Sequence, residues 1–197
     1  MPITDPGAVV PVDLTTPEFV LRPIRANDAE ADHAALMDTR ETLRLWQMST
    51  WPEDDFTVEQ NRDDLVGLEQ RHDERRAYTY TVVDPSGTTC LGCVYVFPIT
   101  ATFLTRSEVT PVAGEDWQDV DAVVFFWVRG PQLATAMDER LLAALRSWFA
   151  DDWGLARTVF ATSELFTQQL DMFERSGLER AFELRDPAQP GRHLVFG

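Results

Sequence analysis

Asp119-Val-Asp-Ala-Val-Val-Phe-Phe-Trp-Val-Arg129 is the stretch of sequence that decides the fold, and Gly130-Pro131 follows it directly. The apolar run predicts a buried strand, and Gly-Pro predicts a tight corner at its end. An amphipathic helix is predicted from Ala134 to Asp152, and then a strand from Leu155 to Thr162 and a second helix that ends before Gly177. This order is typical of an α/β unit. Its corner directs backbone amides and a helix N-terminus to one point, which suits a phosphate or pyrophosphate.

The composition restricts the class of protein. The chain has 197 residues, of which 44% are hydrophobic, and this suits one domain with a full core. We assign residues 1–17 to an N-terminal arm and residues 18–197 to a single domain. There is no basic leader before an apolar run and no apolar run of membrane-spanning length. We therefore expect a soluble, cytoplasmic protein with no membrane partner.

The charge indicates which partners to expect. The formal net charge of −16 at pH 7 would repel a nucleic-acid backbone, so no nucleic-acid partner is expected. It favours a cationic or amine-bearing partner, although acidity that serves solubility alone explains the charge equally well. All 17 basic residues are arginines, and the chain has no lysine. This excludes Schiff-base chemistry and a lysine-containing phosphate loop.

The remaining elements follow from periodicity and turn signals. Asp84-Pro85-Ser86-Gly87 predicts a hairpin between two strands. The segment 99–117 is long for a loop in a compact domain, so it is either a functional loop or a mobile connector. Thr57 opens a helix, with Glu59 completing its cap. Helices are predicted at residues 27–39, 40–48 and 57–73, and strands at 18–25, 76–83, 88–98, 178–184 and 193–196.

Cysteines and histidines give no indication of redox or metal chemistry. Cys90 and Cys93 have the CxxC spacing, but they lie in a predicted strand, where residues three apart point to opposite faces. We interpret them as structural thiols. His33, His72 and His193 lie in distant segments without metal-ligand spacing, so no metal is expected.

Acidic residues provide the candidates for acid–base chemistry. Asp54-Asp55 and Asp63-Asp64 are interpreted as solvated charges at helix ends. Asp119 and Asp121 open the most apolar strand of the chain, where a partly desolvated carboxylate would suit a general base. The alternative is a polar strand start that faces water.

Several segments together resemble the GNAT superfamily of acyl-CoA-dependent N-acetyltransferases, and the resemblance covers residues 19–196. Phe126-Trp-Val-Arg129 is similar to the family's fourth strand, and Phe173-Glu-Arg-Ser-Gly-Leu178 is similar to its YEKxGF segment. Three further segments, Phe19–Ile24, Leu91–Val96 and Gly154–Val159, resemble the family's first strand, its third strand and the strand after its cofactor helix. The resemblance implies an α/β (α+β) fold, with a mixed, twisted central sheet of about seven strands and helices on both faces.

The resemblance also implies a site for acetyl-CoA. The fourth strand would pair with the pantetheine, and the family's pyrophosphate loop, [Q/R]xxGx[G/A], matches Arg129 to Ala134 with Gln132 in place of the central glycine. If that position needs a positive φ, Gln132 is strained by about 1–2 kcal/mol. Pro131 removes one amide from the loop. The implied cofactor-binding residues are Phe126, Trp127, Val128, Arg129, Gly130, Gln132, Leu133, Ala134, Thr135, Phe166 and Phe173.

A second departure concerns the leaving group. Phe173 stands where many members of the family have a tyrosine that protonates the CoA thiolate, and Phe166 stands where an asparagine often begins the helix. Both positions also fit a core stripe at helical spacing. With water as the acid, Asp121, or Glu59 across the cleft, would deprotonate the amine.

The resemblance thus implies an N-acyltransferase that moves acetyl from acetyl-CoA to a primary amine of a small-molecule or peptide acceptor by direct attack. The alternative is a non-catalytic protein of the same fold that binds acyl-CoA or another ligand. The sequence leaves the acceptor's identity open, and the oligomeric state also, a homodimer included.

Overall fold

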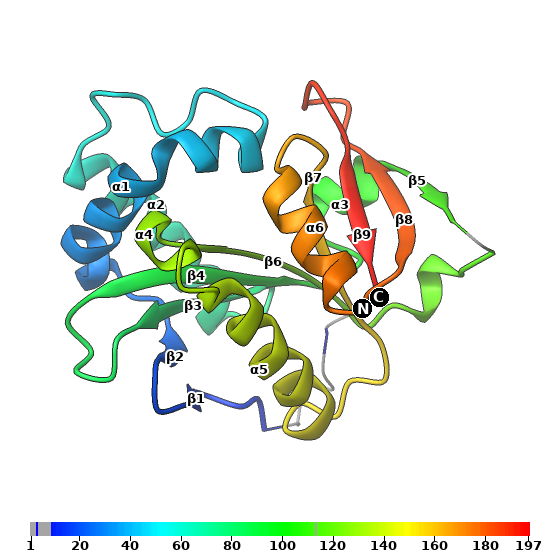
Figure 1. Ribbon diagram of the computed structural model, residues 1–197, viewed down its shortest axis with the longest axis horizontal. Coiled ribbons are helices and arrows are strands. Elements are labelled where there is room, and N and C mark those ends of the chain that lie inside the picture. Colours follow the sequence, from blue (N-terminus) through cyan, green and yellow to red (C-terminus); the bar gives the residue numbers. More distant parts are fainter. Residues whose placement is uncertain (1–2, 4–8, 113) are drawn as a thin grey trace.

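The structure is a computed structural model that describes residue 3 and the segments 9–112 and 114–197. Within these residues, nine strands form one sheet in the order β1-β2-β3-β4-β6-β7-β9-β8-β5 (Figure 1). The strands are β1 (Leu14–Thr15), β2 (Val20–Pro23), β3 (Tyr78–Val83), β4 (Cys90–Phe97), β5 (Glu108–Pro111), β6 (Ala122–Val128), β7 (Thr158–Ser163), β8 (Arg180–Arg185) and β9 (His193–Phe196). The helices are α1 (Ala29–Gln47), α2 (Val58–Asp73), α3 (Thr102–Arg106), α4 (Gly130–Leu133), α5 (Met137–Asp151) and α6 (Thr167–Arg175), with short 3-10 helices η1 (Ala26–Asp28) and η2 (Trp117–Asp119).

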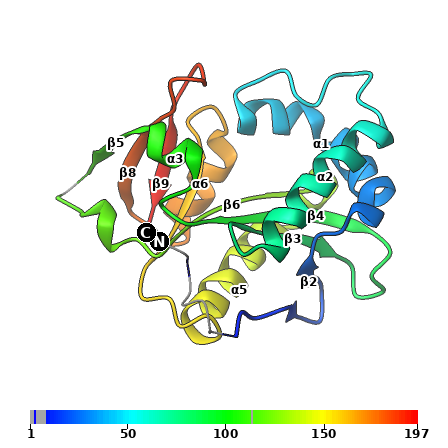
Figure 2. The same cartoon turned by 180° about the vertical axis from the view of Figure 1, so that it is seen from behind.

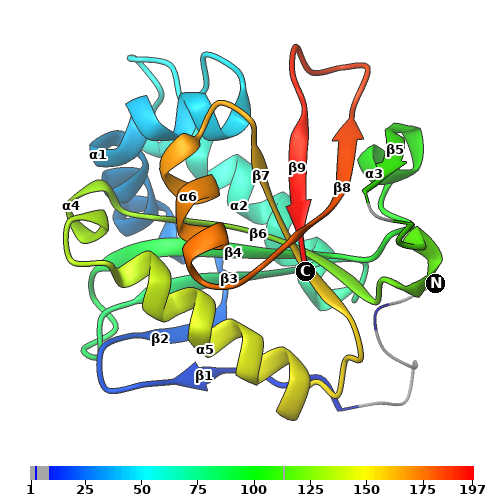
Figure 3. The same ribbon diagram turned by 45° about the vertical axis from the view of Figure 1, so that its right-hand side comes forward.

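The pairing of β6 with β7 positions the candidate site. These strands are the parallel pair in the described part of the sheet, and their register runs from Ala122 opposite Thr158 to Val124 opposite Phe160. Beyond Val124, β6 remains paired with β4, whereas β7 pairs with β9. The two strands therefore diverge, and Figure 3 shows β7, β9 and β8 turning steeply away from β6.

Helices cover both faces of the sheet. α5 and α6 pack on one face against β6 residues such as Val124 and Phe126. α1 and α2 pack on the other face, over Phe125 and Trp127 (Figures 1 and 2). The alternation along β6 follows from the pleat of a strand, which sends successive side chains to opposite faces. Because both faces are covered, β6 is buried along its whole length, and this explains its unbroken apolar sequence.

The predicted mixed sheet with helices on both faces is confirmed, with two more strands than expected. β1 lies inside the predicted arm, so the sheet begins before residue 18. β5 lies inside the predicted loop 99–117 and pairs with β8, far away in the sequence. β1 has only two residues, and β5 is largely exposed and ends in a proline, so neither shows the apolar pattern of a strand. The hairpin between β3 and β4 is confirmed.

The helices differ from the predictions mainly at their ends. The sequence predicts two helices at residues 27–39 and 40–48, but α1 is one continuous helix. Nothing between Thr39 and Arg40 interrupts its backbone hydrogen bonds. Thr57 caps α2 as predicted, but the residue that completes the capping box is Gln60 and not Glu59. The Gln60 amide donates to the Thr57 hydroxyl at 3.2 Å, and the Thr57 amide donates to the Gln60 carboxamide at 2.8 Å. The third helical position is the one that reaches back to the cap, and Glu59 is one residue short of it.

A bulge in β4 overturns the prediction for the cysteines. Gly92 lies opposite Val82 and Cys90 opposite Val83, so Leu91 is an extra residue that shifts the alternation. Cys90 and Cys93 consequently face the same side and join the core beneath α1. Both are free, buried thiols. Burial raises the pKa of Cys90 to about 12, so the thiol stays protonated and unreactive at neutral pH.

Candidate active site

The gap between β6 and β7 is the first part of the candidate site. Gln169, on α6, is 2% exposed, and its Nε2 donates to the Phe126 carbonyl oxygen at 3.0 Å. Its Oε1 is buried and has no hydrogen-bond partner among the described residues. The Phe126 carbonyl is thus satisfied by a side chain from another element, because β7 has moved out of reach. An extended ligand that entered this gap would compete with the Gln169 amide for a hydrogen bond to the Phe126 carbonyl.

Phe173 packs beside the same gap, whereas Phe166 does not. Phe173 is fully buried, and its ring lies 6.0 Å from that of Phe126 and 5.3 Å from that of Phe196. Phe166 is buried on the other face, with the residues beneath α1. The two phenylalanines therefore belong to the cores on opposite faces. Trp127 and Val128 also face opposite sides, and the Trp127 indole donates to the Tyr95 hydroxyl at 3.3 Å.

The corner after β6 is satisfied from within. The Gly130 amide donates to the Thr39 hydroxyl at 2.9 Å, and the amide of Gln132 donates to the Arg129 carbonyl at 2.8 Å. The Thr135 amide donates in turn to the Gln132 carbonyl at 3.0 Å. The Arg129 guanidinium forms an ion pair with Asp38 on α1. The predicted loop residues Arg129 to Thr135 thus lie together, but these amides do not form an open cradle for an anion.

The conformation of this corner corrects two expectations. Gln132 belongs to the short helix α4 and has no positive φ, so the predicted strain at Gln132 is absent. The left-handed residue is Ala136, with φ 55°, and α5 begins just after it, at Met137 rather than Ala134. A one-turn helix and a left-handed residue cannot be recognised from the spacing of apolar residues. The helix start is therefore three residues later than predicted.

A buried carboxyl occupies the N-terminus of α5. Asp138 is 5% exposed, and desolvation raises its pKa, while hydrogen bonds from the backbone amides of Glu139 and Asp138 itself lower it. These first-turn amides are the groups that would otherwise bind an anion. Asp138 thus takes up part of the anion-binding capacity of the helix.

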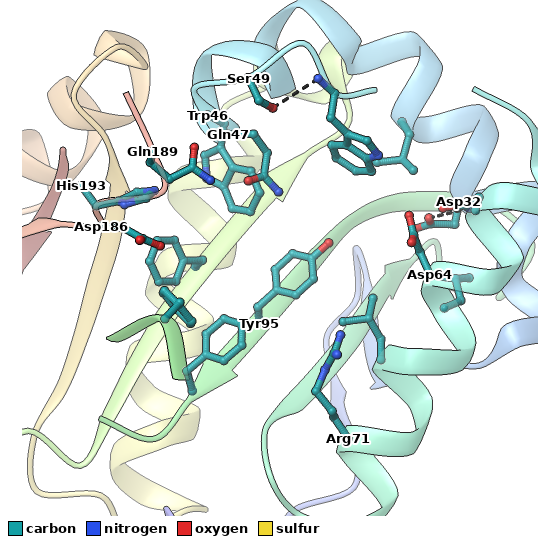
Figure 4. Close-up of a pocket in the computed structure, with 18 of the residues that line it drawn as sticks. Asp32, Trp46, Gln47, Ser49, Asp64, Arg71, Tyr95, Asp186, Gln189 and His193 are labelled. Carbon is teal, nitrogen blue, oxygen red and sulfur yellow. Dashed lines mark hydrogen bonds between the residues drawn. The ribbon is translucent and has the colours of Figure 1, made fainter. Parts of the chain in front are cut away.

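A pocket of about 490 Å³ lies on the α1 and α2 side of the sheet, next to the divergence of the strands (Figure 4). β4 and β6 contribute aromatic rings to it, and β9 contributes His193, whose ring centroid lies 5.2 Å from that of Phe125. The helices contribute an indole and carboxyls. The titratable and aromatic residues that line it include Asp32, Trp46, Asp64, Tyr95, Phe125 and His193.

Burial tunes the titratable groups of this pocket. Desolvation raises the pKa of Asp32 to about 6, opposed by a hydrogen bond from the Asn61 amide at 3.0 Å. Partial desolvation also raises the pKa of Asp64, which Figure 4 shows beside Asp32. Desolvation lowers the pKa of His193 to about 4, so its imidazole is neutral at neutral pH. Burial raises the pKa of Tyr95, so its hydroxyl keeps its proton.

The predicted bases lie away from these groups. Asp121 is half-buried at the start of β6, where its carboxylate accepts a hydrogen bond from the Arg157 amide at 2.8 Å and its own amide donates to the Arg157 carbonyl at 2.9 Å. Asp119 is exposed in η2. Glu59 is exposed on the first turn of α2. Neither Asp121 nor Glu59 lines the pocket.

Most of the pocket residues could not be recognised from the sequence. The sequence predicts a solvated charge at Asp64, and the residue is exposed, but its carboxyl faces the pocket. In the sequence, His193 is a candidate only for metal binding, and no local pattern marks Tyr95. These residues come from separate elements, so no local spacing connects them. One signal was available for Asp32, which is an acid on the apolar stripe of a helix, with Ala35 and Leu36.

The described residues contain no group of three or more His, Cys, Asp or Glu side chains that could hold a metal ion. No helix among them has the length and hydropathy required to cross a membrane.

Solved structures of acetyltransferases share this fold, although no protein-family model and no curated sequence matches the chain. A ribosomal-protein-S5-alanine acetyltransferase from Vibrio fischeri superposes with a TM-score of 0.66 at 18% identity, over 94% of this chain and 95% of that one. RimJ from Mycobacterium smegmatis, solved with CoA-disulfide, gives 0.66 at 17% identity, over 90% and 80%. The microcin C7 self-immunity acetyltransferase MccE, solved with acetyl-CoA and AMP, gives 0.65 at 11% identity, over 92% of both chains. The chain therefore has the fold of the GNAT acetyltransferases, as its sequence resemblance indicated.

Proposed function

We propose that this protein is an N-acetyltransferase that transfers acetyl from acetyl-CoA to a primary amine bound in the pocket. The observation that carries the proposal is the divergence of β6 and β7 directly beside the pocket, between Phe125 and His193. A narrow donor that entered between the strands from the α6 side would deliver its acyl group to the pocket on the α1 side. The similar structures named above with CoA or acetyl-CoA support this choice of donor.

The residues fit the two ends of the donor differently. The gap beside Phe126 and the adjoining pocket suit a pantetheine arm and a small acyl group, once Gln169 turns away. The corner offers a weaker fit to the pyrophosphate, because its amides are hydrogen-bonded and Asp138 lies at the helix N-terminus. Affinity would therefore depend mainly on the arm and the acyl group.

The pocket side chains can perform the proton transfers. The thioester supplies the acetyl group; the amine nitrogen forms the new amide bond, the carbon–sulfur bond breaks and the thiolate takes up a proton. His193, neutral and beside the strand gap, accepts the proton of the amine directly or through one water. Tyr95, which remains protonated, donates a hydrogen bond to the leaving thiolate, and water supplies the proton that Phe173 cannot. Asp121 and Glu59, the bases predicted from the sequence, are the alternatives to His193.

The acceptor is expected to be an amine whose body packs on aromatic rings. Trp46, Tyr95 and Phe125 provide faces for an apolar body or a cation, and Asp64 provides a carboxyl for an ammonium. Holding the amine and the thioester together can lower the activation free energy by about 7–11 kcal/mol. The amine attacks the thioester directly. Neither Cys90 nor Cys93 can form a covalent intermediate, because both thiols are buried and protonated.

A non-catalytic ligand-binding role is the second candidate, and the interactions of Gln169, Gly130 and Asp138 favour it. The two candidates separate in one experiment. We would titrate acetyl-CoA calorimetrically and then measure amine-dependent release of CoA thiol with a panel of primary amines. Binding with thiol release and a matching N-acetyl product by mass spectrometry supports the transferase. Binding of acetyl-CoA without thiol release in the presence of any amine supports the ligand-binding role. Absence of acetyl-CoA binding contradicts both the transferase and an acyl-CoA-binding role.

A further inference from the structure

A second hollow, of about 820 Å³, is lined by four of the 17 arginines of the chain. It lies between the C-terminal end of α2 and the segment from Phe97 to Arg106. The arginines are Arg71, Arg75, Arg76 and Arg106, and no aspartate or glutamate of the described residues lines the hollow. In a chain of net charge −16, with 33 acidic residues, this concentration of positive charge is unexpected.

Some of these arginines take part in ion pairs. Arg76 pairs with Glu74 at 2.5 Å, and Arg106 pairs with Asp186 at 2.5 Å. For Arg71, no ion pair with any described carboxylate is found within 4.0 Å. The lining itself carries four guanidinium groups and no carboxylate of the described residues, so its own charge is positive.

Stabilisation of a helix end explains only part of this cluster. Arg71 is in the last turn of α2, where a cation interacts favourably with the helix dipole. Arg75 and Arg76 follow the end of the helix, and Arg106 comes from α3, which is distant in the sequence. A helix-end effect does not require a cation from another element on the opposite wall of the same hollow.

The hollow adjoins the first pocket. Arg71, Phe97, Phe103 and Arg106 line both. Figure 4 shows Arg71 extending from α2 toward Tyr95 and the interior of the first pocket. A molecule whose amine lies near His193 or Asp64 would thus carry its far end toward the arginines.

We propose that Arg71, Arg75, Arg76 and Arg106 form an anion subsite, which binds a carboxylate or phosphate group carried by the acceptor. Guanidinium groups bind both oxyanions through paired N–H donors, and a planar fork suits them better than an ammonium would. The subsite makes the acceptor an amine that also bears an anion. This replaces the simple cationic acceptor that the net charge favoured, because the charge near the pocket differs from that of the whole chain. The acceptor assignment depends on the proposed transferase function, whereas anion binding does not.

The first test measures anion binding alone. Inorganic phosphate would be titrated calorimetrically into the full chain at constant ionic strength set with sodium chloride. The variants are Arg71→Gln, the double variant Arg71→Gln/Arg75→Gln, and Arg146→Gln as the matched control, since Arg146 lies on α5 at the other face of the sheet. We expect saturable binding by the wild type and the control, and at least a roughly tenfold loss in the double variant. Thermal melts check that each variant is folded, and Arg71→Gln alone serves if the double variant is not.

The second test connects the subsite to the acceptor. Acetyl transfer to phosphoethanolamine and to β-alanine would be compared with transfer to ethanolamine. We expect a KM about tenfold lower for the anionic amines in the wild type, and no such difference in Arg71→Gln. Absence of phosphate binding by the wild type, or equal binding by wild type and double variant, overturns the proposal. Phosphate binding that the double variant loses supports the subsite even if no amine is acetylated, in which case the transferase function fails and the subsite does not.

Discussion

The side-chain amide of Gln169 bonds to the main-chain carbonyl of Phe126 across the gap where β6 and β7 separate, at 3.0 Å. The bond joins α6 to the centre of the sheet and leaves the Oε1 atom of Gln169 buried without a hydrogen-bond partner among the described residues. An unsatisfied buried acceptor destabilises the residue's present position by about 1–3 kcal/mol. An entering ligand can therefore displace the Gln169 side chain with only a small net cost in free energy.

Replacing Gln169 with serine should tighten the binding of acetyl-CoA about fivefold, because the Phe126 carbonyl becomes free to accept a hydrogen bond from the donor. Calorimetry measures the change. Gln168→Ser, on the exposed side of the same helix, is the control and should leave affinity unchanged. Weaker binding in Gln169→Ser would show that Gln169 contacts the donor itself.

Asp138→Asn should also tighten the binding of acetyl-CoA, by about two- to fivefold, because it removes a carboxylate from the N-terminus of α5. The effect should disappear with S-acetyl-N-acetylcysteamine, a thioester that has no pyrophosphate, whereas the effect of Gln169→Ser should persist. Asp151→Asn, at the opposite end of α5, is the matched control. An equal gain with both thioesters would place the influence of Asp138 elsewhere.

His193→Gln should lower the turnover of the acetyl transfer about 100-fold and leave the affinity for acetyl-CoA nearly unchanged, because the variant cannot accept the amine proton. Asp121→Asn and Glu59→Gln should keep most of the turnover, since neither residue lines the pocket. Steady-state kinetics of the three variants with one amine decides among them. Loss of turnover in Asp121→Asn alone would restore the base predicted from the sequence.

Asp32 should make the protein less stable as pH rises from about 4 to 6. Its pKa is raised from 3.8 to about 6 in the folded state, so in this interval the folded state binds more protons than the unfolded state. The full effect is on the order of 3 kcal/mol. Asp32→Asn should remove it, so that the difference in free energy of unfolding, variant minus wild type, increases over this interval. Urea denaturation at several pH values measures the difference, and a difference independent of pH would contradict the assignment.

The sequence predicted the features of this fold that leave a periodic or punctuated pattern. The buried run that became β6, the turn at Asp84 to Gly87 and the cap at Thr57 each involve residues close together in the chain. The features that it did not predict depend on a single conformational detail. Leu91 inserts one residue into β4 and reverses the direction of Cys90, and Ala136 takes a left-handed conformation that delays α5.

The pocket was harder to predict for a related reason. His193, Asp64 and Tyr95 come from β9, α2 and β4, and only the sheet order brings them together. Asp121 was chosen because it opens the most apolar strand, which is a local criterion. In the structure that end of β6 is paired with β7, whereas the pocket lies toward the other end, beyond Val124. The chemistry follows the point where pairing stops, and the sequence of one strand does not show where its neighbour departs.

The two outer strands of the sheet have a consequence for how the protein behaves at high concentration. β1, at one margin, has two residues, and β5, at the other, has four and ends in Pro111, which has no amide to donate. Such margins provide few backbone groups to which a strand of another molecule could add. The long central strands, which have the most aggregation-prone sequences, are shielded on both sides by their neighbours. Growth of fibrils by edge-to-edge addition is thus disfavoured.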